Sequence, residues 1–269
     1  MNYSAQDHVF AVCAYGESPY LEECIRSLEG QTVKSRIVVC TATPNEHIKG
    51  IAAAHGLDVI VNKGPHGIAE DWNFAYKHAG GELVTLAHQD DLYRSDYTQK
   101  ILRKAGKARH PLILFTDYFE IRNGEYSYWN TNVNLLVKKI GQLPLRIPRA
   151  GESRFAKRMV LAFGDMICCP SVTFVRKNLP KQIFQPHFQA NLDWQAWERL
   201  SKHRGEFCYI PEALMGHRIH AESATTKVIG KNHSRSAEDL EMYRRFWPEW
   251  MAQLLNRIYS LSQNGNELE

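Results

Sequence analysis

Apolar runs and amphipathic segments alternate along the first half of the chain. The apolar runs are short, as buried strands are, and span residues 8–15, 35–42, 57–62 and 83–87. The segments between them carry apolar residues at helical spacing and span residues 18–31, 45–56 and 67–81. Repeated strand–helix units of this size predict an α/β fold in which helices flank a mostly parallel central sheet.

The first predicted helix has recognisable start signals. Ser18 can cap its N-terminus, Pro19 suits its first turn, and Leu21, Ile25 and Leu28 recur at helical spacing. We therefore expect a helix that is capped by Ser18 and turns its apolar side toward the sheet.

The alternation is less regular in the second half. Residues 111–125 predict two strands joined by an Asn-Gly turn, and residues 166–179 predict a strand that leads into a helix start. A clear helical pattern covers residues 192–203, and a strand pattern covers residues 206–220.

The tail, residues 234–262, has a helical pattern that Pro248 divides into two helices. One stripe of large apolar side chains runs along it and consists of Tyr243, Phe246, Trp250, Leu254, Ile258 and Leu261. Packing against the domain is the favoured interpretation of this stripe, and a membrane or partner surface is the alternative.

The composition is that of an ordinary globular protein. Of the 269 residues, 44% are hydrophobic and 23% charged, and no apolar stretch approaches the roughly 20 residues that a membrane span needs. The N-terminus lacks the basic and apolar regions of a secretory signal. The six cysteines show neither metal-type spacing nor a disulfide framework, so we expect reduced thiols and a cytoplasmic protein.

Positive charge is concentrated in residues 138–158. This segment holds seven basic residues and one acid, whereas the net charge of the whole chain is only +4. A nucleic-acid footprint would be more extensive and would come with a motif, so no nucleic-acid partner is expected. The segment suits a phosphate-bearing substrate or an anionic membrane surface, and a solvated loop and helix face is the alternative.

Two adjacent carboxylates, Asp90 and Asp91, follow the apolar run at 83–87. Ligands of parallel sheets bind at the carboxyl ends of the strands, which is where these acids fall. Neighbouring carboxylates repel each other unless a cation or hydrogen-bond donors compensate. Hard oxygen ligands of this kind suit Mg²⁺ or Mn²⁺, with substrate phosphates filling the other coordination positions.

Three longer stretches occur around these acids in a specific order. They are CAYGESPYLEECIRSLEGQT, DWNFAYKHAGGELVTLAHQDD and LDWQAWERLSKHRGEFCYIPEALMGHRIHAES. Together they resemble the family-2-type glycosyltransferases of the GT-A fold, which are inverting and use nucleotide-sugar donors. The resemblance covers about residues 8 to 225 and implies a Rossmann-like GT-A domain with a C-terminal helical extension. It assigns residues 1–125 to donor binding, 126–230 to acceptor binding and catalysis, and 231–269 to C-terminal helices.

The resemblance also implies roles at the donor nucleotide. Ala14, Tyr15 and Glu17 match the region that cradles the base and ribose, Asn73 matches an asparagine near the nucleotide, and Gln89 belongs to the DXD-type position. The family often shows an aspartate that meets a uracil ring after the second strand. Here that stretch offers Thr41, Thr43 and Asn45 instead, so a UDP-, dTDP- or GDP-linked donor remains open.

Further roles concern the metal and the chemistry. The resemblance places Asp90 and Asp91 at a divalent metal and the donor, with His220 and Arg218 reaching the metal or diphosphate. Asp193 matches the general base, which would take the proton of an acceptor hydroxyl as it attacks. The acid that usually precedes this aspartate is Leu192 here.

The implied activity is metal-dependent, inverting sugar transfer to a glycan or lipid-linked glycan acceptor. It would serve the synthesis of a cell-surface polysaccharide, lipopolysaccharide or cell-wall glycan, in the cytoplasm or at the inner face of the membrane. A non-catalytic nucleotide-sugar or glycan-binding protein on the same fold is the alternative. From the residues alone, the less favoured alternatives are that Asp193 is a helix cap, His220 an ordinary strand-end histidine and Tyr15 a core residue.

Overall fold

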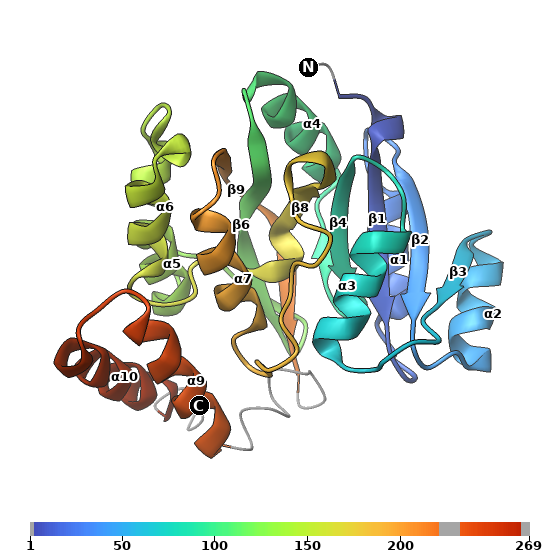
Figure 1. Cartoon of the computed structure of the whole chain (residues 1–269). Helices are drawn as coiled ribbons and strands as arrows, with labels where there is room; N and C mark the ends of the chain where they lie inside the picture. Colours follow the sequence, from blue (N-terminus) through green and yellow to red (C-terminus); the bar gives the residue numbers. More distant parts are fainter. Residues whose placement is uncertain (1–2, 221–231, 265–269) are drawn as a thin grey trace.

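A central β-sheet organises the chain in the computed structural model, which describes residues 3–220 and 232–264. The strands lie in the order β3-β2-β1-β4-β8-β6-β9-β5, and β7 pairs with β6 (Figure 1). Their bounds are β1 (His8–Ala14), β2 (Arg36–Thr41), β3 (Asp58–Val61), β4 (Leu83–His88), β5 (Leu92–Tyr93), β6 (Pro111–Arg122), β7 (Glu125–Ser127), β8 (Val172–Val175) and β9 (Glu206–Ile219).

The first four strands in space, β3, β2, β1 and β4, pair in parallel, and this confirms the predicted α/β class. The sheet becomes mixed beyond β4, because β8 runs antiparallel to both β4 and β6. Strand β9 pairs in parallel with β6 and antiparallel with β5. The regular strand–helix alternation of the sequence therefore corresponds to the parallel half, and the less regular second half builds the mixed part.

Each face of the sheet carries a separate hydrophobic core because side chains alternate along the strands. In β1, Val9 and Ala11 face one core, and Phe10, Val12 and Ala14 face the other. The first core is covered by α3 (Ile68–His78), α6 (Arg154–Leu161), α7 (Leu192–Ser201), α9 (Asn232–Arg244) and α10 (Glu249–Asn264). The second is covered by α1 (Leu21–Glu29), α2 (Glu46–Ala54), α4 (Tyr97–Lys107) and α5 (Val133–Gly141).

Helix α1 starts later than the sequence predicts. Tyr20 occupies the N-cap position, and no side chain caps the helix there. Ser18 instead forms the preceding turn: its hydroxyl accepts the Tyr20 N–H at 3.3 Å and its carbonyl accepts the Leu21 N–H at 3.4 Å. The predicted Ser18 cap is therefore wrong, because one extra turn separates this residue from the helix.

The predicted Asn-Gly turn joins β6 to β7. Asn123 and Gly124 both have positive φ angles, 52° and 83°, which this residue pair tolerates best among dipeptides. The prediction of a tight hairpin at this point is confirmed.

The two predicted tail helices are also present, as α9 and α10, but the stripe along them is divided. Tyr243 is buried and Phe246 packs against the core, whereas Trp250, Leu254 and Ile258 are 64%, 51% and 55% exposed. Helix α10 packs through Ala252, Leu255 and Tyr259 instead. Packing thus explains only the start of the stripe, and the side chain of Leu261 lies outside the described residues. Across residues 3–220 and 232–264, no helix combines the length and apolar character that a membrane crossing requires.

His8 makes the stability of the fold depend on pH. Its buried ring hydrogen-bonds Ser35 and Thr85 at 2.9 Å each, and burial lowers its pKa from 6.5 to about 3. Below pH 6.5 His8 is therefore protonated in the unfolded chain but stays neutral in the folded chain. The folded state loses stability as the pH falls from 6.5 toward 3. Between pH 7 and pH 5 this loss should be about 2 kcal/mol. Urea unfolding of the parent and of His8→Gln measures it, and an equal loss in both proteins would contradict the assignment.

Candidate active site

The ends of β1 and β4 are locked together by a reciprocal pair of hydrogen bonds. The Tyr15 N–H donates to Gln89 Oε1 at 2.9 Å, and Gln89 Nε2 donates to the Tyr15 carbonyl at 3.0 Å. Ala14 is buried just before this junction, whereas the Tyr15 side chain is 66% exposed and so is not a core residue. Glu17 is exposed in the loop that follows. Predicted donor residues therefore stand together at the carboxyl edge of the parallel strands.

The end of β2 is joined to the same loop. The Thr43 hydroxyl accepts the Gly16 N–H at 2.9 Å, and Asn45 donates to the Gly16 carbonyl at 2.9 Å while capping α2. Buried Thr41 accepts the Thr43 N–H at 3.0 Å. These side chains shape the loop after β1, and its contact with the nucleotide, like direct contacts of Thr41 and Thr43 with a base, stays a prediction.

Asn73 is predicted to lie near the nucleotide, but its side chain hydrogen-bonds another part of the chain. Its Oδ1 accepts the N–H groups of Ile183 and Phe184 at 2.9 and 3.0 Å, and its Nδ2 donates to the Phe184 carbonyl at 2.8 Å. These three bonds anchor the segment before α7 to helix α3. A contact between Asn73 and the donor stays a prediction, and in this structure the residue is an anchor.

Asp90 and His220 form a pair at the edge of the sheet. Asp90 Oδ2 lies 3.0 Å from His220 Nε2, and both side chains are about one-fifth exposed (18% and 20%). Arg218 Nε donates to the Asp90 carbonyl at 2.9 Å, and its guanidinium also bonds Glu23 of α1 at 2.6 Å. The end of β9 thus brings its histidine and arginine to the acid that follows β4.

Asp91 has different surroundings, although it is adjacent in sequence. It is fully buried, and its Oδ1 accepts the Arg218 N–H at 2.9 Å and lies 3.0 Å from His217 Nδ1. Burial alone would lower the pKa of His217, but the charge of Asp91, its hydrogen bond to His217 and the charges of Asp90 and Glu120 together outweigh burial and raise the pKa to about 9. Asp91 therefore belongs to a buried charge pair that fixes the end of β9 to the turn after β4.

His88 packs against α3 beside this region. Its ring stacks on Trp72 with centroids 4.7 Å apart, and burial lowers its pKa to about 4, although the charges of Asp90 and Asp193 oppose that shift. The imidazole is therefore neutral at physiological pH. Asp193 lies close enough to act on it electrostatically.

Asp193 projects from the first turn of α7, and Asn191, not Asp193, occupies the N-cap position. Its Oδ1 accepts the Trp194 N–H at 2.9 Å. Trp194 and Trp197 are fully buried, and their indole N–H groups donate to the Leu161 and Ile167 carbonyls at 2.9 Å each. Loss of either indole would cost roughly 3–5 kcal/mol of stability, so the aspartate stands on a rigid support.

The comparisons with known proteins agree with this geometry. The model of glycosyl transferase family 2 matches residues 9–184 of the chain, which include both strand ends and the two adjacent acids. The chain belongs to this family. The structure is therefore that of a GT-A-fold glycosyltransferase, as the resemblance of the three stretches implies.

Solved structures of other proteins with bound nucleotide sugars show the same fold at low sequence identity. Residues 1–349 of TarS from S. aureus with UDP-GlcNAc align with a TM-score of 0.64, 12% identity, and coverage of 93% of this chain and 70% of TarS 1–349. Mannosyltransferase PcManGT from Pyrobaculum calidifontis with GDP-Man and Mn²⁺ aligns with a TM-score of 0.61, 14% identity and coverages of 96% and 71%. Glucosyl-3-phosphoglycerate synthase from Mycobacterium tuberculosis with Mn²⁺ and UDP-Glc aligns with a TM-score of 0.54 and 13% identity, and the alignment covers 90% of this chain and 79% of the synthase. No curated protein sequence matches this one.

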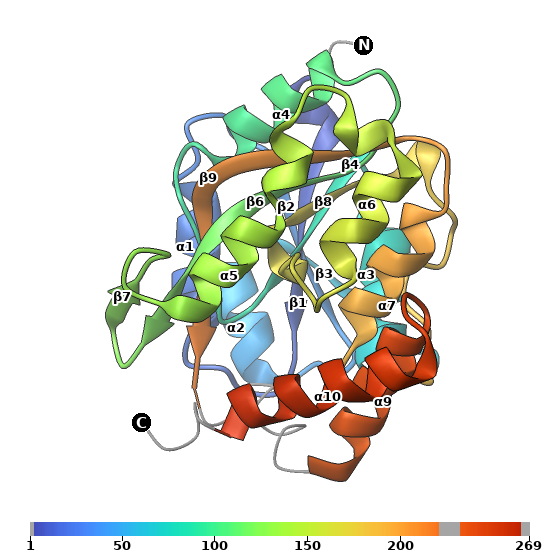
Figure 2. The same cartoon turned by 90° about the vertical axis from the view of Figure 1, so that its left-hand side faces the viewer.

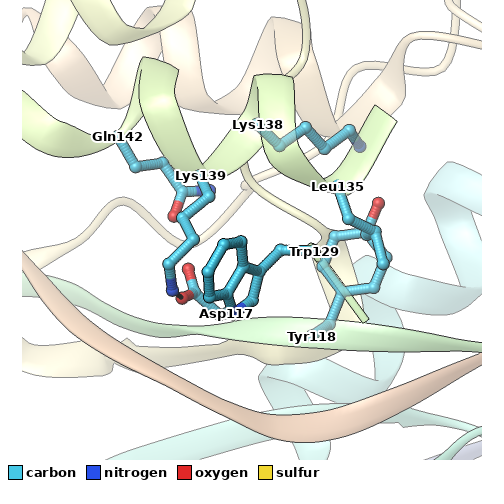
Figure 3. A pocket seen from close by; sticks show the side chains of 7 residues that line it. All are labelled: Asp117, Tyr118, Trp129, Leu135, Lys138, Lys139 and Gln142. Atoms are coloured by element: carbon cyan, nitrogen blue, oxygen red, sulfur yellow. Dashed lines mark hydrogen bonds and ion pairs between the residues drawn. The ribbon is translucent and has the colours of Figure 1, made fainter. Parts of the chain in front are cut away.

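The basic segment of this glycosyltransferase is less exposed than its sequence indicates. Lys139 pairs with Asp117 at 2.6 Å, beneath Trp129, while Lys138 extends from α5 toward Tyr118 (Figure 3). Buried Lys157 donates to two backbone carbonyls, and Arg158 pairs with Glu198 at 2.5 Å. The exposed basic residues of the segment are Arg146, Arg149 and Arg154. Four of the seven charges therefore serve internal contacts.

Sequence reasoning assigned no role to three site residues of this transferase, His88, His217 and Asp165. His88 and His217 lie within the stretches that carry the resemblance, so the sequence could have indicated that they belong to the site. Asp165 is far from every stretch and approaches Asp193 only because the chain folds back before β8, so the sequence carried no signal for it.

Proposed function

We propose that the protein is a metal-dependent, inverting glycosyltransferase that moves a sugar from a nucleotide-sugar donor to an acceptor hydroxyl. The observation that carries the proposal is the Asp90–His220 pair after β4, together with Asp193 of α7, which lies close enough to act electrostatically on the nearby His88. Residues 1–125 would bind the donor, residues 126–230 would bind the acceptor and supply the base, and the C-terminal helices would complete the domain.

Asp90 and His220 fit a divalent cation that is shared with a substrate. Among the described residues there is no cluster of three or more carboxylate, imidazole or thiolate groups that could hold a metal alone. One carboxylate and one imidazole suit Mn²⁺ or Mg²⁺ whose other ligands are diphosphate oxygens and water. Such an ion, when bound, would neutralise charge on the departing nucleoside diphosphate.

The protein side chains supply the remaining functions. Arg218, held by Glu23 and the Asp90 carbonyl, places a fixed positive charge beside the same edge. The loop after β1, with Tyr15 exposed, forms the floor for the nucleotide. Asp193 takes the acceptor proton while the acceptor oxygen attacks the anomeric carbon from the side opposite the diphosphate, which inverts its configuration.

A thermal-shift screen tests donor binding directly. UDP-, dTDP- and GDP-sugars are added with and without Mn²⁺, and one nucleotide class should raise the melting temperature only when the metal is present, because a ligand that binds the native state stabilises it. UDP-GlcNAc, UDP-Glc and GDP-Man are the first choices, since the similar structures contain them. No metal-dependent shift with any donor would count against the proposal.

Peripheral contact with an anionic membrane, on the cytoplasmic side, is part of the proposal because a lipid-linked acceptor would be met there. The outer side of α5 and the turn after it expose Val133, Leu136, Val137, Ile140, Leu143 and Ile147 by 36% to 74%. Arg146 and Arg149 lie next to them, and α10 with its own exposed apolar stripe lies on the same side of the molecule (Figure 2). An apolar surface with neighbouring basic residues suits an anionic bilayer interface.

Liposome co-sedimentation tests this contact. The parent should pellet with vesicles that contain anionic lipid, and the double variant Val137→Glu, Ile140→Glu should stay in solution because it places charge on the apolar surface. Lys107→Glu, at the end of α4, is the control, since it changes the net charge by the same two units. Equal pelleting of parent and double variant, or none of the parent at low salt, would contradict the contact.

A further inference from the structure

The loop between α6 and β8 is held against the first turns of α7 from both sides. The Trp194 indole donates to the Leu161 carbonyl at the end of α6, and the Trp197 indole donates to the Ile167 carbonyl within the loop. The Gln142 side-chain amide bonds the Met166 carbonyl from a third direction. Both indoles follow Asp193 within the first turns of the helix, so they hold the loop alongside the start of α7, where Asp165 lies within hydrogen-bonding reach of Asp193.

The two carboxyl groups are in direct contact. Asp165 is hydrogen-bonded to Asp193, and its own Oδ1 accepts the Ile167 N–H at 3.3 Å. A hydrogen bond between two carboxyl groups requires a proton on one of them, because two carboxylates repel and neither has a donor. Burial raises the pKa of Asp165 well above its ordinary value, and the adjacent charge of Asp193 raises it further.

Several other groups face Asp165. Lys138 of α5 is the cation among them, and it opposes the rise in the pKa of Asp165. The charge of Asp165 also acts on the Tyr259 phenol of α10 and on the Cys168 and Cys169 thiols. Burial keeps the phenol and both thiols protonated by raising their pKa values. One ammonium group therefore balances the one negative charge that the carboxyl pair retains.

We propose that Asp165 is a positioning residue for Asp193: the pair shares one proton, and Asp165 donates it in the hydrogen bond that orients the Asp193 carboxylate. The inference rests on the proposed function, in which Asp193 is the base. During transfer the acceptor O–H bond breaks and its proton goes to Asp193, while a bond forms between the acceptor oxygen and the anomeric carbon. The bond to the diphosphate breaks and its electron pair leaves with that group. Asp165 keeps its own proton throughout.

An NMR titration of the full chain labelled with ¹³C-aspartate decides the proposal without any substrate. The Asp165 signal is identified by its absence in Asp165→Asn. It should have the shift of a neutral acid at pH 7, and its midpoint should move to lower pH in Asp193→Asn, where the neighbouring negative charge is gone. An Asp165 that is ionised at pH 7, or a midpoint that does not move, overturns the proposal.

Kinetics of two Asp165 variants provide the second measurement, with donor hydrolysis as the readout for the donor found in the thermal screen. Asp165→Asn keeps a neutral donor and should retain kcat within about threefold, whereas Asp165→Ala should lower kcat about 100-fold with the donor KM unchanged. A merely structural role predicts equal losses in both variants, together with lower melting temperatures. If Asp193→Asn keeps full transfer, the proposed base is wrong, whereas an active Asp165→Ala beside an inactive Asp193→Asn defeats only the positioning role.

Discussion

Asp193→Asn should reduce sugar transfer by about 10³-fold or more while the protein stays folded and binds its donor. An asparagine of the same shape cannot accept the proton of the attacking hydroxyl, and general base catalysis typically contributes 10²–10⁴-fold. The fold should tolerate the change because Asp193 is partly exposed and does not cap α7. Transfer of radiolabelled sugar from the donor, together with the Mn²⁺-dependent thermal shift, measures both properties.

Asp58→Asn is the matched control for this experiment. Asp58 begins β3, at the opposite end of the parallel strands from the site, and its side chain is 80% exposed. The control should keep full activity. If Asp193→Asn also keeps full activity with the donor that binds, another group removes the acceptor proton. If no variant and no parent transfers sugar but all bind the donor, a non-catalytic binding protein on the same fold is the better description.

Substitutions at the neighbouring residues Asp90 and Asp91 should affect different properties, metal binding in the first case and stability in the second. Asp90→Asn removes the carboxylate that faces His220, so the Mn²⁺-dependent thermal shift and transfer should be lost, with little change in the stability of the metal-free protein. Asp91→Asn breaks a buried charge pair with His217 and should lower the free energy of unfolding by about 3 kcal/mol. Urea unfolding without metal, and melting temperatures with donor and Mn²⁺, separate the two effects.

His220→Gln serves as the second test of the metal pair and should reproduce the loss seen in Asp90→Asn. A reversed result, in which Asp91→Asn loses the metal response but keeps its stability and Asp90→Asn behaves as the parent, would move the metal site to Asp91. The sequence named both acids as metal residues, and the burial of Asp91 is the reason for dividing their roles.

The pattern of the sequence was sufficient for the parallel half of the sheet. In the segments at 8–91, each strand is followed by a helix with its own apolar side, so local periodicity and chain order together specify neighbours and direction. The mixed half needed more information. Strand β8 enters between β4 and β6 from a distant part of the chain, and nothing local to residues 172–175 indicates which partners it will find.

The same division applies to the site. The sequence by itself determined the family, the fold class and the candidate chemical groups, because these depend on short stretches in a fixed order and on side-chain types. Only the tertiary structure decided that Asp90 faces His220 while Asp91 is buried with His217, that Asn73 anchors a loop, and that Asp165 meets Asp193. A hydrogen bond depends on distance and direction between groups more than a hundred residues apart, as with Asp90 and His220, and on the water excluded around them. Those quantities exist only after the helices and strands have packed.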